Sequence, residues 1–313
     1  MILDKIKIMN AKNILKLIIA VIISVGLIYY SLQEFDYRLF LQSISQANYI
    51  YISIAVFILI ITIQIRAIRW KIILNQSIQI NDLYIAQLIG YMGNNLLPLR
   101  FGEFLKSFYL EKKTKISKYE VFGSIILERI LDLSSLVFLF ILLIQSSLFD
   151  KIDGSYQNII IGLITFSLCL IIVSYYFNKN LKNRLFNKAP KFLYNIIVGF
   201  SNIKTSNILV LIITSIFIWI NYILVVYLVQ LSFQLELSLM QSILLLLIST
   251  VVLSIPALPG NIGTFESSVV YTLSLYGITD NFGFGFILHS VSFIPYTLLG
   301  LMYFVKERKI IFK

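Results

Sequence analysis

Three ionisable residues within one apolar stretch are the most chemically suggestive feature of the sequence. Glu128, Arg129 and Asp132 occur in the segment LERILD, inside the apolar run Val121–Phe149. Residues three and four positions apart lie on one side of a helix, so these side chains are expected to gather there. Because charges within an apolar span are costly, such residues normally face the protein interior or water. Two roles stay open for them: the path of a substrate or proton, or a structural ion pair.

A second polar cluster lies in the stretch NNLLPLRFGEFLK, residues 94–106. Arg100 follows the helix-breaking Pro98 and is either a clamp for an anion or a charge that extends to the cytoplasmic interface. Glu103 is expected in the first turn of a helix, where the dipole favours a carboxylate, and it could also pair with Arg100 or carry a proton. Asn95 could line a gap between helices, although asparagine is also common in irregular backbone.

The stretch ALPGNIGTFE, residues 257–266, repeats the pattern of LPLRFGEF, because both contain L-P-x-x-x-G-x-F. An offset of 161 residues pairs Pro98 with Pro259 and Gly102 with Gly263. Proline removes a backbone donor and interrupts a helix, and glycine permits the turn that follows. A new half-helix is then expected after each break, and its positive N-terminal end attracts anions.

The same offset places His289 at the position of Glu128. His289 is either a proton relay or a hydrogen-bonded structural group. Glu266 begins the second expected half-helix, where it is either a carboxylate stabilised by the dipole or part of a binding site.

The composition is that of a membrane protein. Charged residues make up 13% of the 313 residues, about half of what is usual in a soluble domain, and the mean hydropathy is +0.88. Several apolar runs approach or exceed the roughly 20 residues that cross a membrane core. These runs are Ile14–Leu32, Tyr49–Ile65, Val121–Phe149, Ile159–Phe177, Ile208–Phe233 and Phe282–Val305.

The sequence argues against several kinds of chemistry. Cys169 and His289 are the single cysteine and histidine, so neither a disulfide nor a multi-histidine metal site can form within the chain. No nucleotide-binding loop of the GxxxxGK[ST] or GxGxxG type occurs. No cofactor is therefore expected.

The net charge of +11 is distributed as in a membrane protein rather than a nucleic-acid-binding one. Lysine and arginine gather in short loops at the ends of apolar runs, which sets orientation, and no nucleic acid is expected as a partner. Arg66, Arg69 and Lys71 follow an apolar run, and topology with anionic head groups explains them. The distribution of charges fits a protein of the cytoplasmic membrane with both termini in the cytoplasm. This requires two segments that each return to the side from which they enter: Leu83–Leu110 from the cytoplasm and Met240–Tyr276 from outside.

We therefore predict an all-α polytopic membrane protein with about six transmembrane helices and two re-entrant helical hairpins. A single membrane domain would cover residues 1–313, with halves of about 1–150 and 151–313 arranged as an inverted repeat. Inverted repeats with interrupted helices are typical of secondary transporters, whose sites lie near the membrane midplane.

Three blocks carry a family resemblance: NNLLPLRFGEFLKSFYL, SIILERILDL and ALPGNIGTFE. Together they resemble the transmembrane region of lysylphosphatidylglycerol synthases, the flippase-like membrane proteins. The resemblance implies a domain that moves or presents a lipid. No soluble aminoacyltransferase domain follows the last apolar run, so we expect no lipid aminoacylation and no enzyme activity. The residues at the family's motif positions are Arg100, Glu103, Glu128, Arg129, Asp132, Pro259, Gly260, Gly263 and Glu266.

The expected function is translocation of a phosphate-bearing lipid, of a phospholipid or polyprenyl type, bound between the two hairpins. The alternatives are an enzyme or enzyme subunit acting on a lipid carrier, and a lipid-binding scaffold without transport. The expected partners are membrane lipids with anionic head groups. A second copy of the chain and a separate lipid-modifying enzyme stay open as partners.

Overall fold

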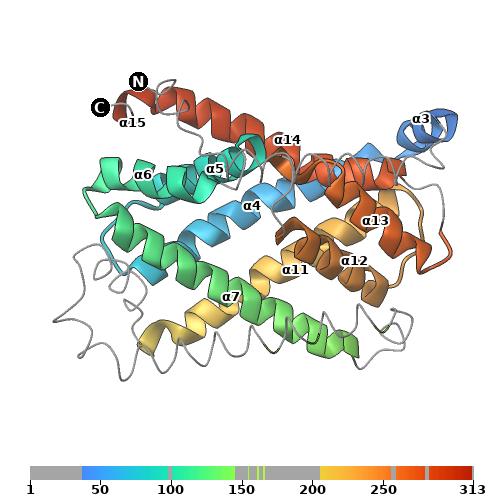
Figure 1. Cartoon of the computed structure of the whole chain (residues 1–313), viewed down its shortest axis with the longest axis horizontal. Helices are drawn as coiled ribbons and strands as arrows, with labels where there is room; N and C mark the ends of the chain where they lie inside the picture. The colour runs from blue at the N-terminus through green and yellow to red at the C-terminus, as the bar shows by residue number, and fades with distance from the viewer. Residues whose placement is uncertain are drawn as a thin grey trace, which may run out of the picture.

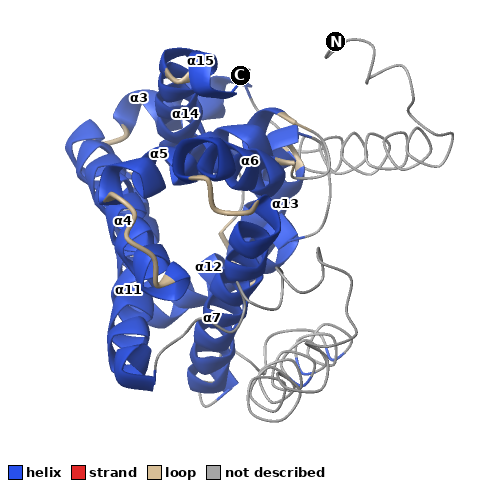
Figure 2. Cartoon of the chain, turned by 90° about the vertical axis from the view of Figure 1, so that its left-hand side faces the viewer, coloured by secondary structure: helices blue, strands red, loops and turns tan. Residues whose placement is uncertain are grey.

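The computed structural model describes residues 37–97, 101–144, 205–254, 259–278 and 282–311, with the isolated residues 154, 161 and 165. In this part of the chain the regular elements are all helices, and no strand occurs (Figures 1 and 2). The α-helices are α3 (Tyr37–Gln46), α4 (Tyr49–Leu74), α5 (Ile80–Leu96), α6 (Gly102–Thr114), α7 (Lys118–Ile144), α11 (Ile208–Ser232), α12 (Leu239–Ser254), α13 (Thr264–Ser274), α14 (Phe282–Lys306) and α15 (Arg308–Ile311). Short 3-10 turns cover η4 (Thr205–Asn207) and η5 (Pro259–Asn261).

The order of helix lengths occurs twice along the chain. The helices α4, α5, α6 and α7 have 26, 17, 13 and 27 residues. The helices α11, α12, α13 and α14 have 25, 16, 11 and 25 residues. Each set is therefore a long helix, two short helices and a second long helix.

Three helices, α4, α11 and α14, are long and apolar enough to cross a membrane. Helix α7 is as long, but its apolar part contains Glu128, Arg129 and Asp132. The four long helices coincide with four of the six apolar runs predicted from the sequence. The other two runs, Ile14–Leu32 and Ile159–Phe177, lie outside the described residues, so the prediction of six spans stays a prediction.

The short helices lie where the two interruptions were predicted. At 1.5 Å per residue, α5 is about 25 Å long and the other three are shorter, below the roughly 30 Å of a membrane core. Helix α5 ends at Leu96 and α6 begins at Gly102, where the Gly102 N–H donates to Oδ1 of Asn94 at 3.0 Å. A Cβ on Gly102 would collide with the Gly90 carbonyl oxygen, so the absence of a side chain lets α6 pack closely against α5.

The second interruption lies at η5, between α12 and α13. Gly260 has a φ of +70° and Gly263 a φ of +84°, conformations that glycine adopts without strain. Gly260 lies against the end of α5: its Cβ position is 3.2 Å from the carbonyl oxygen of Asn95 and in collision with the Phe293 ring of α14. The two helix breaks therefore meet.

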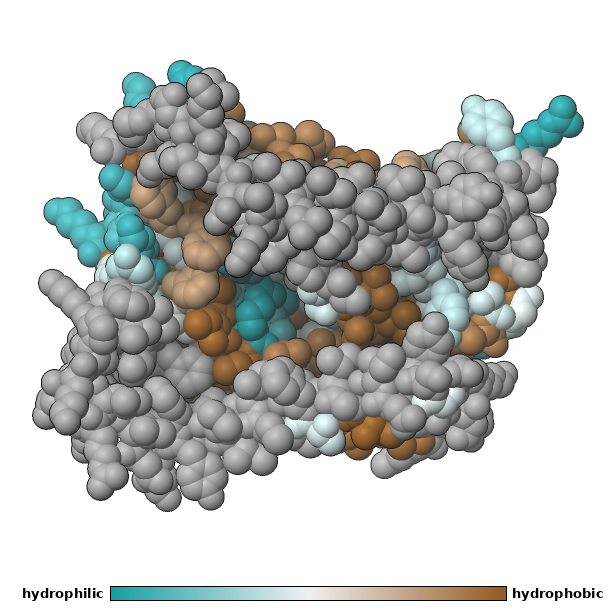
Figure 3. Space-filling view, in the orientation of Figure 1, coloured by the Kyte–Doolittle hydropathy of each residue, from teal (hydrophilic) through white to brown (hydrophobic). Residues whose placement is uncertain are grey.

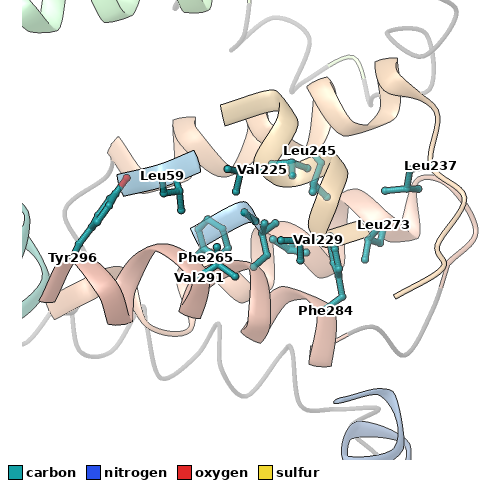
Figure 4. Packing of buried hydrophobic residues seen from close by; sticks show 14 of the residues in the cluster. Leu59, Val225, Val229, Leu237, Leu245, Phe265, Leu273, Phe284, Val291 and Tyr296 are labelled. Atoms are coloured by element: carbon teal, nitrogen blue, oxygen red, sulfur yellow. The ribbon is translucent and has the colours of Figure 1, made fainter. Parts of the chain in front are cut away.

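Helices from both sets share one hydrophobic core (Figure 4). Leu59 of α4 packs in the same cluster as Val225 and Val229 of α11 and Phe265 of α13. Val291 on α14 lies in this cluster as well. Figures 1 and 2 show α4 and α11 running side by side, and α5 and α6 adjacent to each other. Helix α7 packs on α4 in a second cluster, where Val121 and Ile125 join Ala67 and Trp70.

Candidate functional site

A network of ion pairs joins α4, α6 and α7 inside the protein, and hydrogen bonds extend it to α11. Its centre is formed by Arg66 and Arg69 of α4, Lys106 of α6, and Glu128 and Asp132 of α7, all of which are buried. A buried charge is tolerated when it is paired and its remaining donors and acceptors are satisfied. The contacts of each carboxylate show how far this requirement is met.

Glu128 is the most enclosed of the carboxylates. Its Oε2 accepts from Nζ of Lys106 at 2.7 Å, and its Oε1 accepts from Arg66 at 3.2 Å and Gln87 at 3.1 Å. Lys106 also donates to Oε1 of Gln87 at 3.0 Å, and its ammonium lies 4.0 Å from the centre of the Trp70 ring. The ammonium donors are thus directed at protein groups, and the Lys106–Glu128 pair holds α6 on α7.

Asp132 lies one helical turn beyond Glu128 on α7 and accepts hydrogen bonds from three arginines. Arg66 donates to Oδ2 through both terminal nitrogens at 3.1 Å, and Arg69 donates to Oδ1 at 2.7 Å. The same arginines reach α11: Nε of Arg66 donates to the Tyr222 hydroxyl at 2.9 Å, and Arg69 donates to Oγ of Ser215 at 3.1 Å. These bonds fix the positions of α4, α7 and α11 relative to one another.

Arg129 and Glu103 form the outer end of the network. Nη2 of Arg129 donates to Oε1 of Glu103 at 2.9 Å, and Nη1 donates to Oδ2 of Asp132 at 3.3 Å. The Arg129 side chain is 43% exposed and that of Glu103 is 22% exposed. Nε of Arg129 has no hydrogen-bond partner in the described part of the chain. This pair is the part of the network that an outside molecule can reach.

Hydrophilic residues are visible near the centre of one face of the molecule, with hydrophobic residues beside them (Figure 3). In the described part of the chain, the network contains four cations and three carboxylates. The cations are Arg66, Arg69, Lys106 and Arg129, and the carboxylates are Glu103, Glu128 and Asp132. The network therefore carries one positive charge in excess, which favours an anion at its accessible end.

A second buried pair lies at the start of α13. Oε1 of Glu266 is 2.7 Å from Nδ1 of His289, and Oε2 of Glu266 accepts the Gly263 N–H at 2.7 Å. The His289 ring stacks on Phe265 with centroids 4.7 Å apart and meets the edge of Phe293 at 5.5 Å. Glu266 thereby caps α13 and connects it to α14.

The candidate residues predicted from the sequence fall into three groups in the structure. Glu103, Glu128, Arg129 and Asp132 share one network, and the expectation that the LERILD charges gather is met. The second group joins Gly263, Glu266 and His289. Asn95 and Gly260 meet where the breaks adjoin, and Asn95 Nδ2 donates to the Thr297 hydroxyl at 2.9 Å. Pro259 begins η5, and Arg100 and Pro98 lie outside the described residues.

The sequence interpretation of Arg66 and Arg69 was wrong. Both were explained as charges beyond the end of an apolar run, but α4 continues to Leu74 and buries both in the ion network. Lys106 and Gln87 were not proposed as site residues either, although both contact Glu128. One signal in the sequence was the spacing of Arg66 and Arg69. Residues three positions apart lie on one face of a helix, so both cations can face the two carboxylates of α7.

Comparison with known proteins decides the family. The family model described as the lysylphosphatidylglycerol synthase transmembrane region matches residues 17–300. The chain belongs to this family. A UPF0104 membrane protein of Methanocaldococcus jannaschii is 28% identical over 225 residues, which is 70% of this chain and 95% of the relative.

A second UPF0104 membrane protein of Methanocaldococcus jannaschii is 27% identical over 281 residues, covering 80% of this chain and 82% of the relative. One from Methanothermobacter thermautotrophicus is 25% identical over 272 residues, covering 77% and 80%. No solved structure matches the chain. Membership of the family, together with the apolar helices α4, α11 and α14, identifies the chain as an integral membrane protein.

Proposed function

We propose that this member of the lysylphosphatidylglycerol synthase transmembrane family translocates a lipid with an anionic, phosphate-bearing head group. The observation that carries the proposal is the half-exposed pair of Arg129 and Glu103 at the end of a buried, net-positive network. A guanidinium presents a planar set of donors that suits a phosphate. Arg129 is therefore the residue that would meet the head group.

Binding would occur by exchange of partners at Arg129. Glu103 occupies Nη2 of Arg129 at 2.9 Å, while Asp132 holds Nη1 at 3.3 Å. A phosphate oxygen that replaces Glu103 would keep Arg129 paired and would neutralise the excess charge. The buried contacts of Asp132 with Arg66 and Arg69 would stay in place and keep the guanidinium oriented. Such preorganisation lowers the entropy cost of binding.

The proposed path runs between two re-entrant hairpins, α5–α6 and α12–α13, in an inverted repeat. Three observations support this arrangement: the repeated order of helix lengths, the short helices on either side of each break, and the contact of Gly260 with Asn95. Backbone interrupted within a membrane needs protein or water around it, and here each break lies against the other. Rocking of the two halves about this junction would then alternate access.

The proposal places the chain in the cytoplasmic membrane with both termini in the cytoplasm, following the distribution of lysine and arginine. It also treats the chain as a transporter rather than an enzyme. A separate lipid-modifying enzyme as supplier or consumer of the lipid, and association of two copies, are compatible with it. A scaffold that binds lipid without moving it is the alternative that an experiment must separate.

The test is lipid movement in proteoliposomes that contain the purified chain. Fluorescent lipids with anionic and zwitterionic head groups, and a polyprenyl phosphate, are placed in both leaflets, and a membrane-impermeant quencher reports how fast the inner leaflet becomes accessible. We expect faster movement of at least one anionic lipid than in protein-free vesicles. Binding of that lipid without any acceleration would show a scaffold and overturn the proposal.

A further inference from the structure

The Glu266–His289 pair takes no part in the binding of the head group proposed above, yet it is buried and ionisable. Glu266 is placed at the N-terminal end of α13, where Oε2 accepts the Gly263 N–H at 2.7 Å. That backbone hydrogen bond and the helix dipole both favour the ionised carboxylate. A carboxylate can only accept hydrogen bonds, so Nδ1 of His289 carries the hydrogen that points to Oε1, 2.7 Å away.

The ring can hold a second proton at Nε2 without losing this bond. Protonation leaves the Nδ1–H to Oε1 contact intact and turns it into an ion pair, which strengthens it. The Phe265 ring lies face to face with the imidazole at 4.7 Å, and an aromatic face stabilises a neighbouring cation. The pair therefore has two charge states in one geometry: a net negative state with neutral histidine and a neutral state with imidazolium.

The pair is connected to the junction of the two helix breaks through Phe293. The Phe293 and His289 rings meet edge to face with their centroids 5.5 Å apart, and the Phe293 ring occupies the space beside Gly260 where a Cβ would otherwise lie. The Phe293 carbonyl also accepts from Nδ2 of Asn95 at 3.3 Å. A change of charge at His289 is thus two contacts away from the hinge on which the proposed rocking depends.

The helices packed against α14 carry other ionisable groups. Around Tyr296 these are Tyr91 of α5, which stacks on Tyr296 at 4.7 Å, and the bonded pair of Arg66 and Tyr222 from α4 and α11. Further groups on the packed elements are Tyr37 and Arg38 of α3, Tyr49, Tyr51, Arg69 and Lys71 of α4, Asp82 and Tyr84 of α5, Tyr227 of α11, Tyr271 of α13, and Arg308 and Lys309 of α15. Within the described part of the chain, the ionisable partner of the imidazole is Glu266.

We infer that Glu266 and His289 form a proton-binding site that couples lipid movement to the proton gradient. Nε2 of His289 takes the proton from one aqueous side and returns it to the other, while Glu266 remains a carboxylate throughout. A pair with no net charge crosses the low-dielectric part of the path at lower cost than a charged one. This inference rests on the proposed function, because it names the energy source of the same transport.

The first experiment observes the proton directly. His289 is the single histidine of the chain, so isotope-labelled histidine gives one imidazole signal in lipid nanodiscs. We expect the signal to change from the neutral Nδ1–H tautomer to imidazolium as the pH is lowered. A ring that keeps one protonation state at every pH at which the protein stays folded would overturn the inference, whatever the transport assay shows.

The second experiment measures coupling in proteoliposomes with the membrane voltage clamped to zero. With one proton moved per lipid, a pH difference should enrich the lipid in one leaflet up to about tenfold per pH unit. The matched variant is His289→Asn, because the asparagine amide replaces Nδ1–H and keeps a donor for Glu266 but cannot take a proton. We expect it to move the lipid more slowly, because Glu266 then stays charged, and without enrichment.

The outcomes separate the two proposals. Lipid movement in the wild-type protein without enrichment under a pH difference would overturn the coupling and leave the proposed function standing. Equal enrichment with His289→Asn would also overturn the coupling. Absence of any lipid movement by the wild-type protein would overturn the proposed function and the coupling with it. Should the variant fold poorly, the titration of the wild-type ring still decides whether the proton site exists.

Discussion

Nζ of Lys106 lies 2.7 Å from Oε2 of Glu128, and this contact attaches the short helix α6 to the long helix α7. The pair of Glu266 and His289, also 2.7 Å apart, does the same for α13 and α14. An offset of 161 residues places His289 at the position of Glu128. The two attachments differ in chemistry: Lys106 and Glu128 are enclosed by further charges, whereas the imidazole has aromatic neighbours.

Removal of one partner from the Lys106–Glu128 pair should be strongly destabilising. Lys106→Met leaves Glu128 buried without its ammonium, and a broken buried pair of this kind costs about 3–5 kcal/mol. We expect a large fall in the midpoint of thermal unfolding in detergent. Glu103→Gln, at the half-exposed end of the network, should change the midpoint far less.

The double variant Lys106→Met with Glu128→Gln provides the control for this prediction. Because the second change removes the charge left unpaired by the first, the double variant should lose less stability than the sum of the single variants. Additive losses would mean that the two residues act independently, contrary to the contact.

Gly260→Ala should disrupt the junction between the two helix breaks. The new Cβ would adopt a strained backbone conformation at φ +70° and would also collide with Phe293. Gly277→Ala is a matched control, since its φ is +73° but no atom lies within 4 Å of the new Cβ. We expect both variants to lose about 1–2 kcal/mol from the backbone, and Gly260→Ala a further 1–3 kcal/mol from overpacking. Equal midpoints of thermal unfolding would contradict the contact.

Gly300→Ala should separate α14 from α5. Its Cβ would collide with Cβ of Met92 and lie 2.5 Å from the Leu88 carbonyl oxygen, and backbone cannot move aside cheaply. Gly285→Ala on the same helix meets its nearest atoms, in Val269, at 3.4 Å, an ordinary contact. The midpoint of thermal unfolding should fall clearly for Gly300→Ala. Gly285→Ala should be neutral or gain up to about 1 kcal/mol of helix propensity.

The proposed re-entrant arrangement of α5 and α6 predicts from which side of the membrane two exposed positions can be reached. In a Cys169→Ser background, single cysteines are placed at Asn81 in the first turn of α5 and at Lys112 near the end of α6. Both should react with a membrane-impermeant reagent from one and the same side of the membrane. Reaction from opposite sides would show that the pair crosses the membrane as a single span and would remove the hairpin.

The long helices and the positions of both breaks could be predicted from the sequence. The apolar run of α11 was predicted as Ile208–Phe233 and the helix spans Ile208–Ser232, because an uninterrupted apolar stretch leaves few alternatives. The breaks followed from proline and glycine at matched positions. The gathering of Glu128, Arg129 and Asp132 followed from helical spacing alone.

The cations at the centre of the network could not be assigned in the same way. Arg66 and Arg69 lie near the end of an apolar run, where a snorkelling arginine and a buried one look alike in sequence. Their burial depends on α7 approaching α4, which is a long-range contact across 62 and 66 residues. The role of Lys106 could not be predicted from the sequence for the same reason, because its partners Gln87 and Glu128 lie on two other helices.

The proposed contact of Arg129 with the head group of a translocated lipid can be measured through the rate of lipid movement for two arginine variants in proteoliposomes. Arg129→Gln removes the half-exposed guanidinium of the network, and Arg308→Gln removes an exposed guanidinium from α15. We expect Arg129→Gln to lose most of the movement of anionic lipid and Arg308→Gln to retain it. Equal rates for the two variants, at equal amounts of folded protein, would show that Arg129 does not bind the head group.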